Sequence, residues 1–359
     1  MRKKDYILIA VRRLPDGRLL KYVRNMSKAY ICILFYCMLR RADKVKEKNM
    51  IKIDLITGFL GSGKTTFIKK YASYLLKKGM NIGILENDFG AVNVDMMLLQ
   101  DLMGDNCELE MVSGGCDADC HRRRFKTKLI AMGMCGYDRV IVEPSGIFDV
   151  DEFFDALHEE PLDKWYEIGN VIAIVDAKLA EDFSAEADYL LASEVADAGC
   201  VLLSRSQEAT EEEIQSTKEH LNRALGQIQC KRRLNSEILD GNWDDLTDTD
   251  LEKILDCGYV AEDYVKESYA EGGGFDSLFF MNVHKSEAEL RKTAEKILND
   301  PSCGAVFRVK GFLKKEDGHW LELNATRHEI SIRPTKLGQE IMIVIGEKLN
   351  KEVIDGYWK

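Results

Sequence analysis

The feature that most constrains how this chain folds is a glycine-rich segment at residues 58–66. It reads Gly-Phe-Leu-Gly-Ser-Gly-Lys-Thr-Thr and contains the pattern G-x-x-x-x-G-K-[ST]. A β-branched run of strand length (IKIDLIT, 51–57) precedes it, and a helical pattern follows as far as Lys78. A strand, a glycine loop and a helix in this order predict a P-loop, whose backbone N–H groups and helix N-terminus hold phosphate oxygens.

The residue types of this loop predict which atoms meet a nucleotide. Lys64 is expected to reach the β- and γ-phosphates, and the Thr65 hydroxyl is expected to bind Mg²⁺. The glycines let the loop curl so that successive N–H groups point inward. The predicted phosphate-binding set is Gly58, Gly61, Ser62, Gly63, Lys64, Thr65 and Thr66.

A second carboxylate is needed to hold the water shell of the metal, usually at the end of a hydrophobic strand. The run 139–143 (RVIVE) ends in Glu143, and Gly146 follows in the next turn, where its N–H is expected to approach the γ-phosphate. An ordinary carboxylate that caps the turn is the alternative interpretation of Glu143.

A third predicted strand, 81–87 (NIGILEN), carries Glu86, and Asp95 follows it in the chain. Loops after parallel strands meet at one sheet edge, so either carboxylate could touch the metal or position water, although a solvated turn is also consistent with the sequence. The predicted catalytic set is Lys64, Glu143 and Glu86.

The charge of the chain is unevenly distributed. Residues 1–49 hold 14 basic and four acidic side chains, a net charge of +10. Because the whole chain has a net charge of −11, residues 50–359 carry a net charge of −21. So acidic a body does not attract nucleic acid by bulk electrostatics, and a phosphate ligand must be held by a local, shaped site.

The basic N-terminal extension at 1–49 contains an 11-residue apolar run at 29–39. This run is shorter than the roughly 17–25 residues that a membrane helix needs, so no membrane span is expected. An interfacial anchor and a partner-binding helix are alternatives. We favour a natural start at Met50, because the phosphate motif begins directly after it.

Ten cysteines are spread over a long chain without a cleavable secretory signal, which favours a reduced, cytoplasmic setting. Cys107, Cys116 and Cys120 lie within 14 residues, and this is the cysteine cluster that suggests chemistry. Cys107 fits a core strand, because CELEMV alternates apolar and acidic side chains.

Alternating strand and helix patterns predict a doubly wound α/β domain with a mainly parallel sheet, over residues 50–230. The segment 231–273 is predicted as a helical connector that ends in Glu271-Gly-Gly-Gly274, and 274–359 as a smaller α+β domain. The predicted strands are 51–57, 81–86, 107–112, 139–143, 169–176 and 199–203, then 275–283, 305–313, 320–323 and 341–345; the predicted helices are 64–78, 123–134 and 208–224, then 288–298 and 347–354.

Several ordered motifs resemble those of the CobW-type P-loop GTPases. They are TGFLGSGKTT at 57–66, ENDFG at 86–90, Gly-Cys at 115–116, EPSG at 143–146 and IVDA at 174–177, and VFRVKGFL at 306–313 resembles the core of that family's C-terminal domain. The resemblance implies GTP hydrolysis with Mg²⁺, coupled to delivery of a divalent transition metal such as zinc or cobalt to a client metalloenzyme. The residues alone predict only a magnesium-dependent nucleotide site.

The metal motif departs from the family pattern Gly-Cys-x-Cys-Cys. This chain reads GCDADCH at 115–121, with Ala118 and Asp119 at the positions of the second and third cysteines. A mixed site of Cys116, Cys120, Asp119 and His121 is predicted, harder in character and weaker for a thiophilic metal. The alternative is a pair of loop thiols beside a solvated acidic turn.

The base-recognition element also departs from the family, which uses Asn/Thr-Lys-x-Asp to bind guanine. The matching residues here are Ser204, Arg205, Ser206 and Gln207. Gln207 is neutral and lacks the charge-assisted discrimination of an aspartate, while Arg205 is expected to pack its guanidinium over the purine ring.

The favoured function is therefore a GTP-binding and GTP-hydrolysing metallochaperone. An ATP-using or nucleotide-promiscuous ATPase or kinase and a non-catalytic nucleotide sensor are the alternatives. Self-association into a homo-oligomer is left open by the sequence.

Overall fold

The protein is described here by a computed structural model, which covers residues 9–13, 19–23, 50–88, 98–113, 118–144, 150–179, 183–266, 275–315, 317–327, 329–335, 338 and 340–359. The first fifty residues form a unit of their own. Within it, β1 (Ile9–Arg13) pairs with β2 (Leu19–Val23) as an antiparallel hairpin that the sequence patterns did not predict. The apolar run at 29–39 lies outside the described residues. No helix in the described ranges has the length and apolar character to cross a bilayer.

A seven-stranded parallel sheet carries the P-loop. Its order is β5-β4-β6-β3-β7-β8-β9, and every neighbouring pair is parallel. The strands are β3 (Ile51–Thr57), β4 (Ile82–Asp88), β5 (Cys107–Ser113), β6 (Arg139–Pro144), β7 (Tyr166–Asp176), β8 (Cys200–Ser204) and β9 (Ile238–Leu239). The predicted doubly wound, mainly parallel α/β fold is confirmed.

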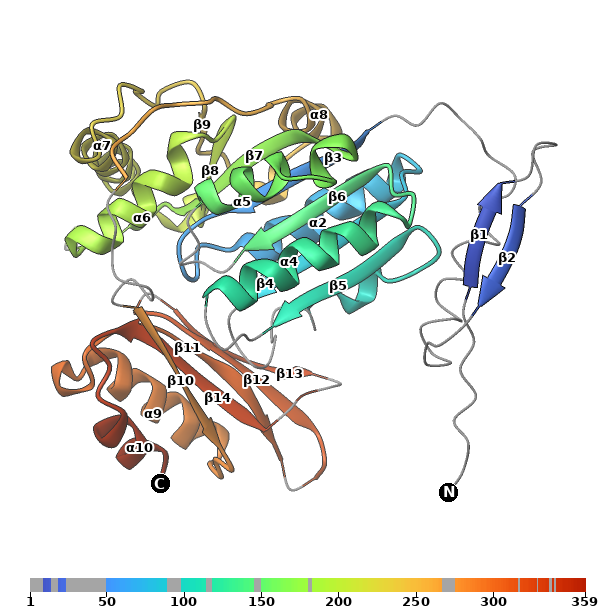
Figure 1. Cartoon of the computed structure of the whole chain (residues 1–359). Helices are drawn as coiled ribbons and strands as arrows, with labels where there is room; N and C mark the ends of the chain where they lie inside the picture. The colour runs from blue at the N-terminus through green and yellow to red at the C-terminus, as the bar shows by residue number, and fades with distance from the viewer. Residues whose placement is uncertain are drawn as a thin grey trace, which may run out of the picture. The chain divides into compact units, whose positions relative to one another are not determined.

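Helices cover both faces of this sheet (Figure 1), because its strands are apolar on both sides. One core cluster packs α2 (Lys64–Lys77) and α8 (Asp248–Leu255) on the sheet. The cluster on the other face draws on α4 (Ala118–Gly133), α5 (Val150–His158), α6 (Ala185–Ala196) and α7 (Glu211–Gln227). Both β9 and α8 come from the segment predicted as a connector, so part of that segment completes the first domain.

The C-terminal region forms a five-stranded antiparallel sheet of order β10-β14-β11-β12-β13. The strands are β10 (Phe275–Met281), β11 (Ala305–Lys314), β12 (Trp320–Ala325), β13 (Ile330–Thr335) and β14 (Ile341–Glu347). The helices α9 (Glu287–Asn299) and α10 (Lys351–Trp358) pack on one face of this sheet (Figure 1). The predicted smaller α+β domain is confirmed.

The helix expected at 347–354 starts later than predicted. Glu347 is the last residue of β14. Lys348 has a positive φ of 50°, which fits neither a strand nor a right-handed helix, so α10 cannot start directly after β14. The Asn350 side chain then accepts a hydrogen bond from the Val353 N–H and caps α10.

The face of the C-terminal sheet away from its helices contacts the P-loop. Leu60 packs against an apolar cluster on this face that includes Phe312 and Ile343. Phe59 contacts Phe307 edge to face, with ring centroids 5.6 Å apart. The two large residues of the glycine loop therefore anchor it to the C-terminal domain.

Candidate functional site

A cavity of about 460 Å³ opens at the carboxyl edge of the seven-stranded sheet, where parallel α/β sheets bind ligands. Most of the predicted site residues line it, although they come from distant parts of the chain. These are Gly61, Ser62, Gly63, Lys64, Thr65, Thr66, Glu143, Ser204, Arg205 and Gln207. Gly58 and Glu86 lie near it without lining it, and Gly146 and Asp95 lie outside the described residues.

The glycine loop curls as its sequence predicts. Gly61 and Gly63 have φ values of 78° and 102°, a conformation that favours glycine, and Gly63 is the N-cap of α2. At Gly58, a Cβ atom would lie 2.2 Å from the carbonyl oxygen of Ile174, so no side chain fits there. The Lys64 ammonium donates a hydrogen bond of 2.6 Å to the Gly58 carbonyl, which folds it back over the loop.

Hard oxygen ligands meet at the start of α2. The Thr65 hydroxyl donates a hydrogen bond of 2.8 Å to Oε1 of Glu143, and both residues are buried. Glu86 is buried on the neighbouring strand, directly opposite Glu143 in the β4–β6 register. Because Mg²⁺ prefers oxygen ligands, a hydroxyl and a carboxylate side by side fit a magnesium ion.

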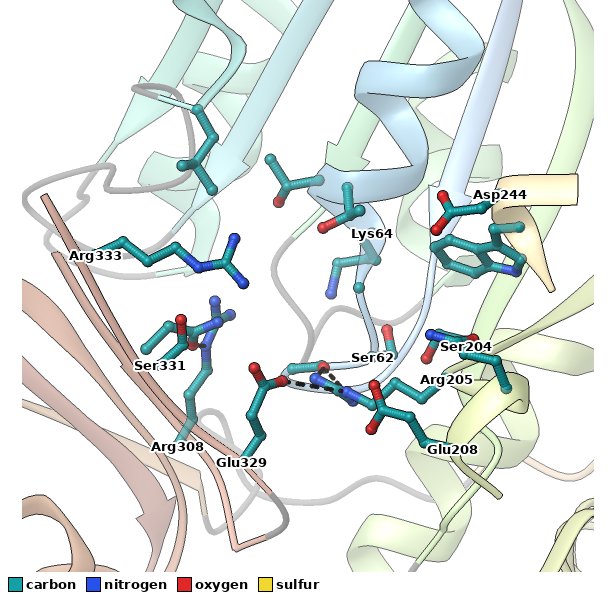
Figure 2. Close-up of a pocket in the computed structure, with 18 of the residues that line it drawn as sticks. Ser62, Lys64, Ser204, Arg205, Glu208, Asp244, Arg308, Glu329, Ser331 and Arg333 are labelled. Carbon is teal, nitrogen blue, oxygen red and sulfur yellow. Dashed lines mark hydrogen bonds and ion pairs between the residues drawn. The ribbon is translucent and has the colours of Figure 1, made fainter. Parts of the chain in front are cut away.

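Arg205 is held by acidic partners at the mouth of the cavity. It has a left-handed backbone conformation and forms an ion pair with Asp176. Its Nε lies 3.6 Å from Oε2 of Glu329 (Figure 2). Its Nη atoms also donate to the Gly61 carbonyl at 3.3 and 3.4 Å. These contacts tie the guanidinium to the loop and to the C-terminal domain; its packing on a purine stays a prediction. Gln207 is exposed in the following turn.

Residues 52–233 match the family model described as CobW/HypB/UreG, nucleotide-binding domain. The chain belongs to this family. It is 30% identical over 176 residues to the zinc chaperone YjiA of Escherichia coli (strain K12), a match that covers 46% of this chain and 52% of that relative. It is 25% identical over 230 residues to zinc-regulated GTPase metalloprotein activator 1 of Saccharomyces cerevisiae, covering 60% of this chain and 53% of that relative.

The chain thus spans about half the length of the curated relatives that it matches. The crystal structure of Zn(II)-bound YjiA GTPase from E. coli aligns with 86% of this chain and 98% of that chain at 21% identity, with a TM-score of 0.33.

Further residues line the cavity of this CobW/HypB/UreG domain that the sequence motifs did not identify. Asn242, Trp243 and Asp244 come from the segment before α8. The Trp243 ring lies 3.6 Å from the place where a Cβ of Gly63 would stand, and it meets Phe67 edge to face at 5.6 Å. A lone tryptophan in an acidic, polar segment was the available signal.

The C-terminal sheet also contributes to the cavity, through polar side chains on its helix-free face. They are Arg308, Glu322, Asn324, Glu329, Ser331 and Arg333. No sequence motif could have found them, because their position depends on how two domains pack.

The predicted transition-metal site of this CobW/HypB/UreG chain falls largely outside the described residues. Cys116 and the side chain of Asp119 lie outside the described part of the chain, while Cys120 is half-buried and His121 is buried in the first turns of α4. Among the side chains that the structure does place, no group of three His, Cys, Asp or Glu residues could hold a metal. The mixed thiolate and carboxylate site stays a prediction.

Proposed function

We propose that this protein binds and hydrolyses GTP and couples nucleotide turnover to the binding and delivery of a divalent transition metal to a client metalloprotein. The observation that carries the proposal is that Lys64, Thr65 and Glu143 line one cavity. Thr65 and Glu143 form a hydrogen bond there although they are 78 residues apart in the chain. The names of the relatives, zinc chaperones and a zinc-regulated GTPase, favour zinc as the cargo.

Residues in and beside the cavity have separate tasks in this proposal. The backbone N–H groups from Gly61 to Thr65 and the Lys64 ammonium bind the phosphates, while Thr65 and Glu143 hold Mg²⁺. The magnesium ion, when bound, neutralises charge that develops on the phosphate oxygens. Glu86, opposite Glu143 in the sheet, is assigned to orient the attacking water.

The order of the strands supports coupling of the nucleotide to the metal. The carboxyl end of β5 leads toward the metal motif, and its last residue, Ser113, pairs with Asp88 two residues after Glu86. A change in the loops that bind the phosphates would therefore occur next to the segment after β5, which leads to Cys120 and His121. Such nucleotide-dependent ordering of loops is the usual switch of P-loop proteins.

Calorimetric titration of the full chain with GTP in Mg²⁺ tests nucleotide binding. Lys64→Ala should weaken GTP binding about 100-fold or more, whereas Lys77→Ala, an exposed position on the same helix, should not change it. Undiminished GTP binding by Lys64→Ala would contradict the proposal.

Zinc titration tests the coupling. We expect the zinc affinity of the full chain to differ at least several-fold between its complexes with GDP and with a non-hydrolysable GTP analogue. A zinc affinity that is the same in both complexes removes the metal-carrier function and leaves a nucleotide hydrolase.

A second candidate is an ATP-using or nucleotide-promiscuous hydrolase. It is favoured by Gln207, a neutral residue where the family resemblance expects an aspartate, and by the acidic partners that hold Arg205. Parallel titration with ATP and GTP separates the two functions: equal affinities support the second.

A further inference from the structure

Two arginines on the helix-free face of the C-terminal sheet line the cavity that contains the glycine loop. Along β12 and β13, alternate residues such as Leu323 and Ile332 pack toward α9, so the residues between them occupy the other face. Arg333 on β13 belongs to this second face, as does Arg308 on β11. Figure 2 shows both guanidinium groups directed into the cavity.

Arg308 lies directly against the glycine loop. A Cβ atom built on Gly61 would stand 4.0 Å from Cδ of Arg308 and 3.1 Å from Cγ2 of Thr326. The Nε of Arg308 donates a hydrogen bond of 2.9 Å to Oδ1 of Asn324, which fixes the plane of the guanidinium. Its charge is therefore positioned at the loop before any ligand binds.

The two arginines lie at the end of the cavity opposite the base-recognition loop. In Figure 2, Ser204, Arg205 and Glu208 stand on one side, Arg308 and Arg333 on the other, and Lys64 lies between them. A nucleotide with its base at Ser204–Gln207 and its phosphates on the glycine loop directs its last phosphate toward the arginines.

We propose that Arg308 and Arg333 bind the terminal phosphate of a nucleoside triphosphate, so that the C-terminal sheet completes the nucleotide site. This inference rests on the proposed function. Guanidinium groups suit it because their N–H donors match phosphate oxygens in pairs. Glu322 is the residue opposite Arg333 in the β12–β13 register, and both side chains line the cavity. A triphosphate draws Arg333 away from this neighbour, and a diphosphate does not reach it.

Through these arginines the C-terminal domain senses whether the bound nucleotide has a terminal phosphate. The same sheet packs on the P-loop through Leu60 and holds Arg205 through Glu329. Loss of the terminal phosphate removes the ligand shared by the two domains, while these side-chain contacts and the contact of Phe59 with Phe307 remain. The orientation of the C-terminal domain then depends on the number of phosphates.

The test is calorimetric titration of the full chain with GDP and with a non-hydrolysable GTP analogue in Mg²⁺. Arg333→Gln should lower the affinity for the analogue about tenfold or more and change the affinity for GDP less than about threefold. Arg308→Lys, which keeps the charge and the stem beside Gly61, should show a smaller loss confined to the analogue. Lys292→Gln, the same charge change at an exposed position of α9, should alter neither affinity.

The outcomes separate the two proposals. If wild type binds the analogue in a Lys64-dependent way but Arg333→Gln and Arg308→Lys bind it as well as wild type does, the arginine assignment is overturned and the proposed function stands. Equal losses for GDP and analogue also overturn it, because the residues then act on domain packing. If wild type binds neither nucleotide, both proposals fail.

Discussion

The Thr65 hydroxyl donates to the Glu143 carboxylate across 2.8 Å, which joins the first turn of α2 to the end of β6 inside the cavity. This hydrogen bond forms only when α2, which carries Thr65, and β6, which carries Glu143, are both in place. The pair therefore links correct folding of the sheet directly to the geometry of the proposed magnesium site.

Replacing Glu143 by glutamine tests this site. The variant keeps the size of the side chain and an oxygen acceptor for Thr65 but loses the charge that favours Mg²⁺. We expect GTP hydrolysis to fall about 10- to 100-fold and the Mg²⁺ concentration for half-maximal activity to rise. Steady-state hydrolysis over a Mg²⁺ titration measures both, with Glu110→Gln on β5 as the control. An unaltered Mg²⁺ dependence contradicts the assignment.

Gln207→Asp tests base recognition. An ionised aspartate accepts hydrogen bonds from the guanine ring N–H and amino group, whereas the exposed Gln207 offers a neutral amide. We expect the ratio of GTP to ATP affinity to increase about tenfold or more. Competition binding with both nucleotides measures this ratio. Gln215→Glu adds the same charge on α7 and should leave the ratio as in wild type. A ratio that does not move in Gln207→Asp places guanine recognition elsewhere.

The first half of the site could be predicted because its signals are local. The strand 51–57, the glycine loop and the start of α2 are consecutive, and each needs residue types that the sequence displays. Glu143 could also be predicted from the sequence, since a carboxylate at the end of a buried parallel strand lies at the same sheet edge as the loop.

The second half could not be predicted because it depends on contacts between distant segments. Arg308 and Gly61 are 247 positions apart, and the packing of Phe59 and Leu60 on the C-terminal sheet brings them together. On β13 the ISIRPT pattern is short and contains Pro334, which weakens the strand signal and suits its edge position. No pattern in the sequence therefore marked Arg333 on this strand as a residue of the site.

A buried ion pair predicts a large stability effect away from the cavity. Arg139 on β6 donates to Asp54 on β3 at 2.6 and 2.7 Å, and both side chains are almost fully shielded from solvent. Arg139→Met leaves the Asp54 carboxylate buried without its counter-ion, which should lower the free energy of unfolding by about 3–5 kcal/mol. Chemical denaturation measures the loss.

Two further variants show whether the charge is the cause. The double variant Asp54→Leu, Arg139→Met should recover much of the stability, because it removes the stranded charge as well. Lys164→Met breaks an exposed pair with Glu160 and should cost less than about 1 kcal/mol. A single variant Arg139→Met as stable as Lys164→Met would show that the buried pair contributes little.

A buried carboxyl on α6 gives the protein a pH-dependent stability. Glu194 is 1% exposed, and neither carboxylate oxygen has a hydrogen-bond partner among the residues that the structure describes. Burial raises the pKa of Glu194 from 4.5 to about 8, against a smaller opposing effect of the Lys64 charge. Below pH 4.5 this carboxyl is protonated in both the folded and the unfolded chain, so it does not affect stability there.

Between about pH 4.5 and 8 the unfolded chain releases the Glu194 proton while the folded chain keeps it. Its contribution to the free energy of unfolding therefore falls as pH rises, by up to about 1.4 kcal/mol per pH unit, and is constant above pH 8. Glu194→Gln removes this dependence. The melting temperature of the variant minus that of wild type should grow from pH 5 to pH 8 and then level off. Glu295→Gln, at an exposed position of α9, should have the melting temperature of wild type at every pH. A difference that stays constant across this range would mean that Glu194 ionises in the folded protein near its ordinary pKa.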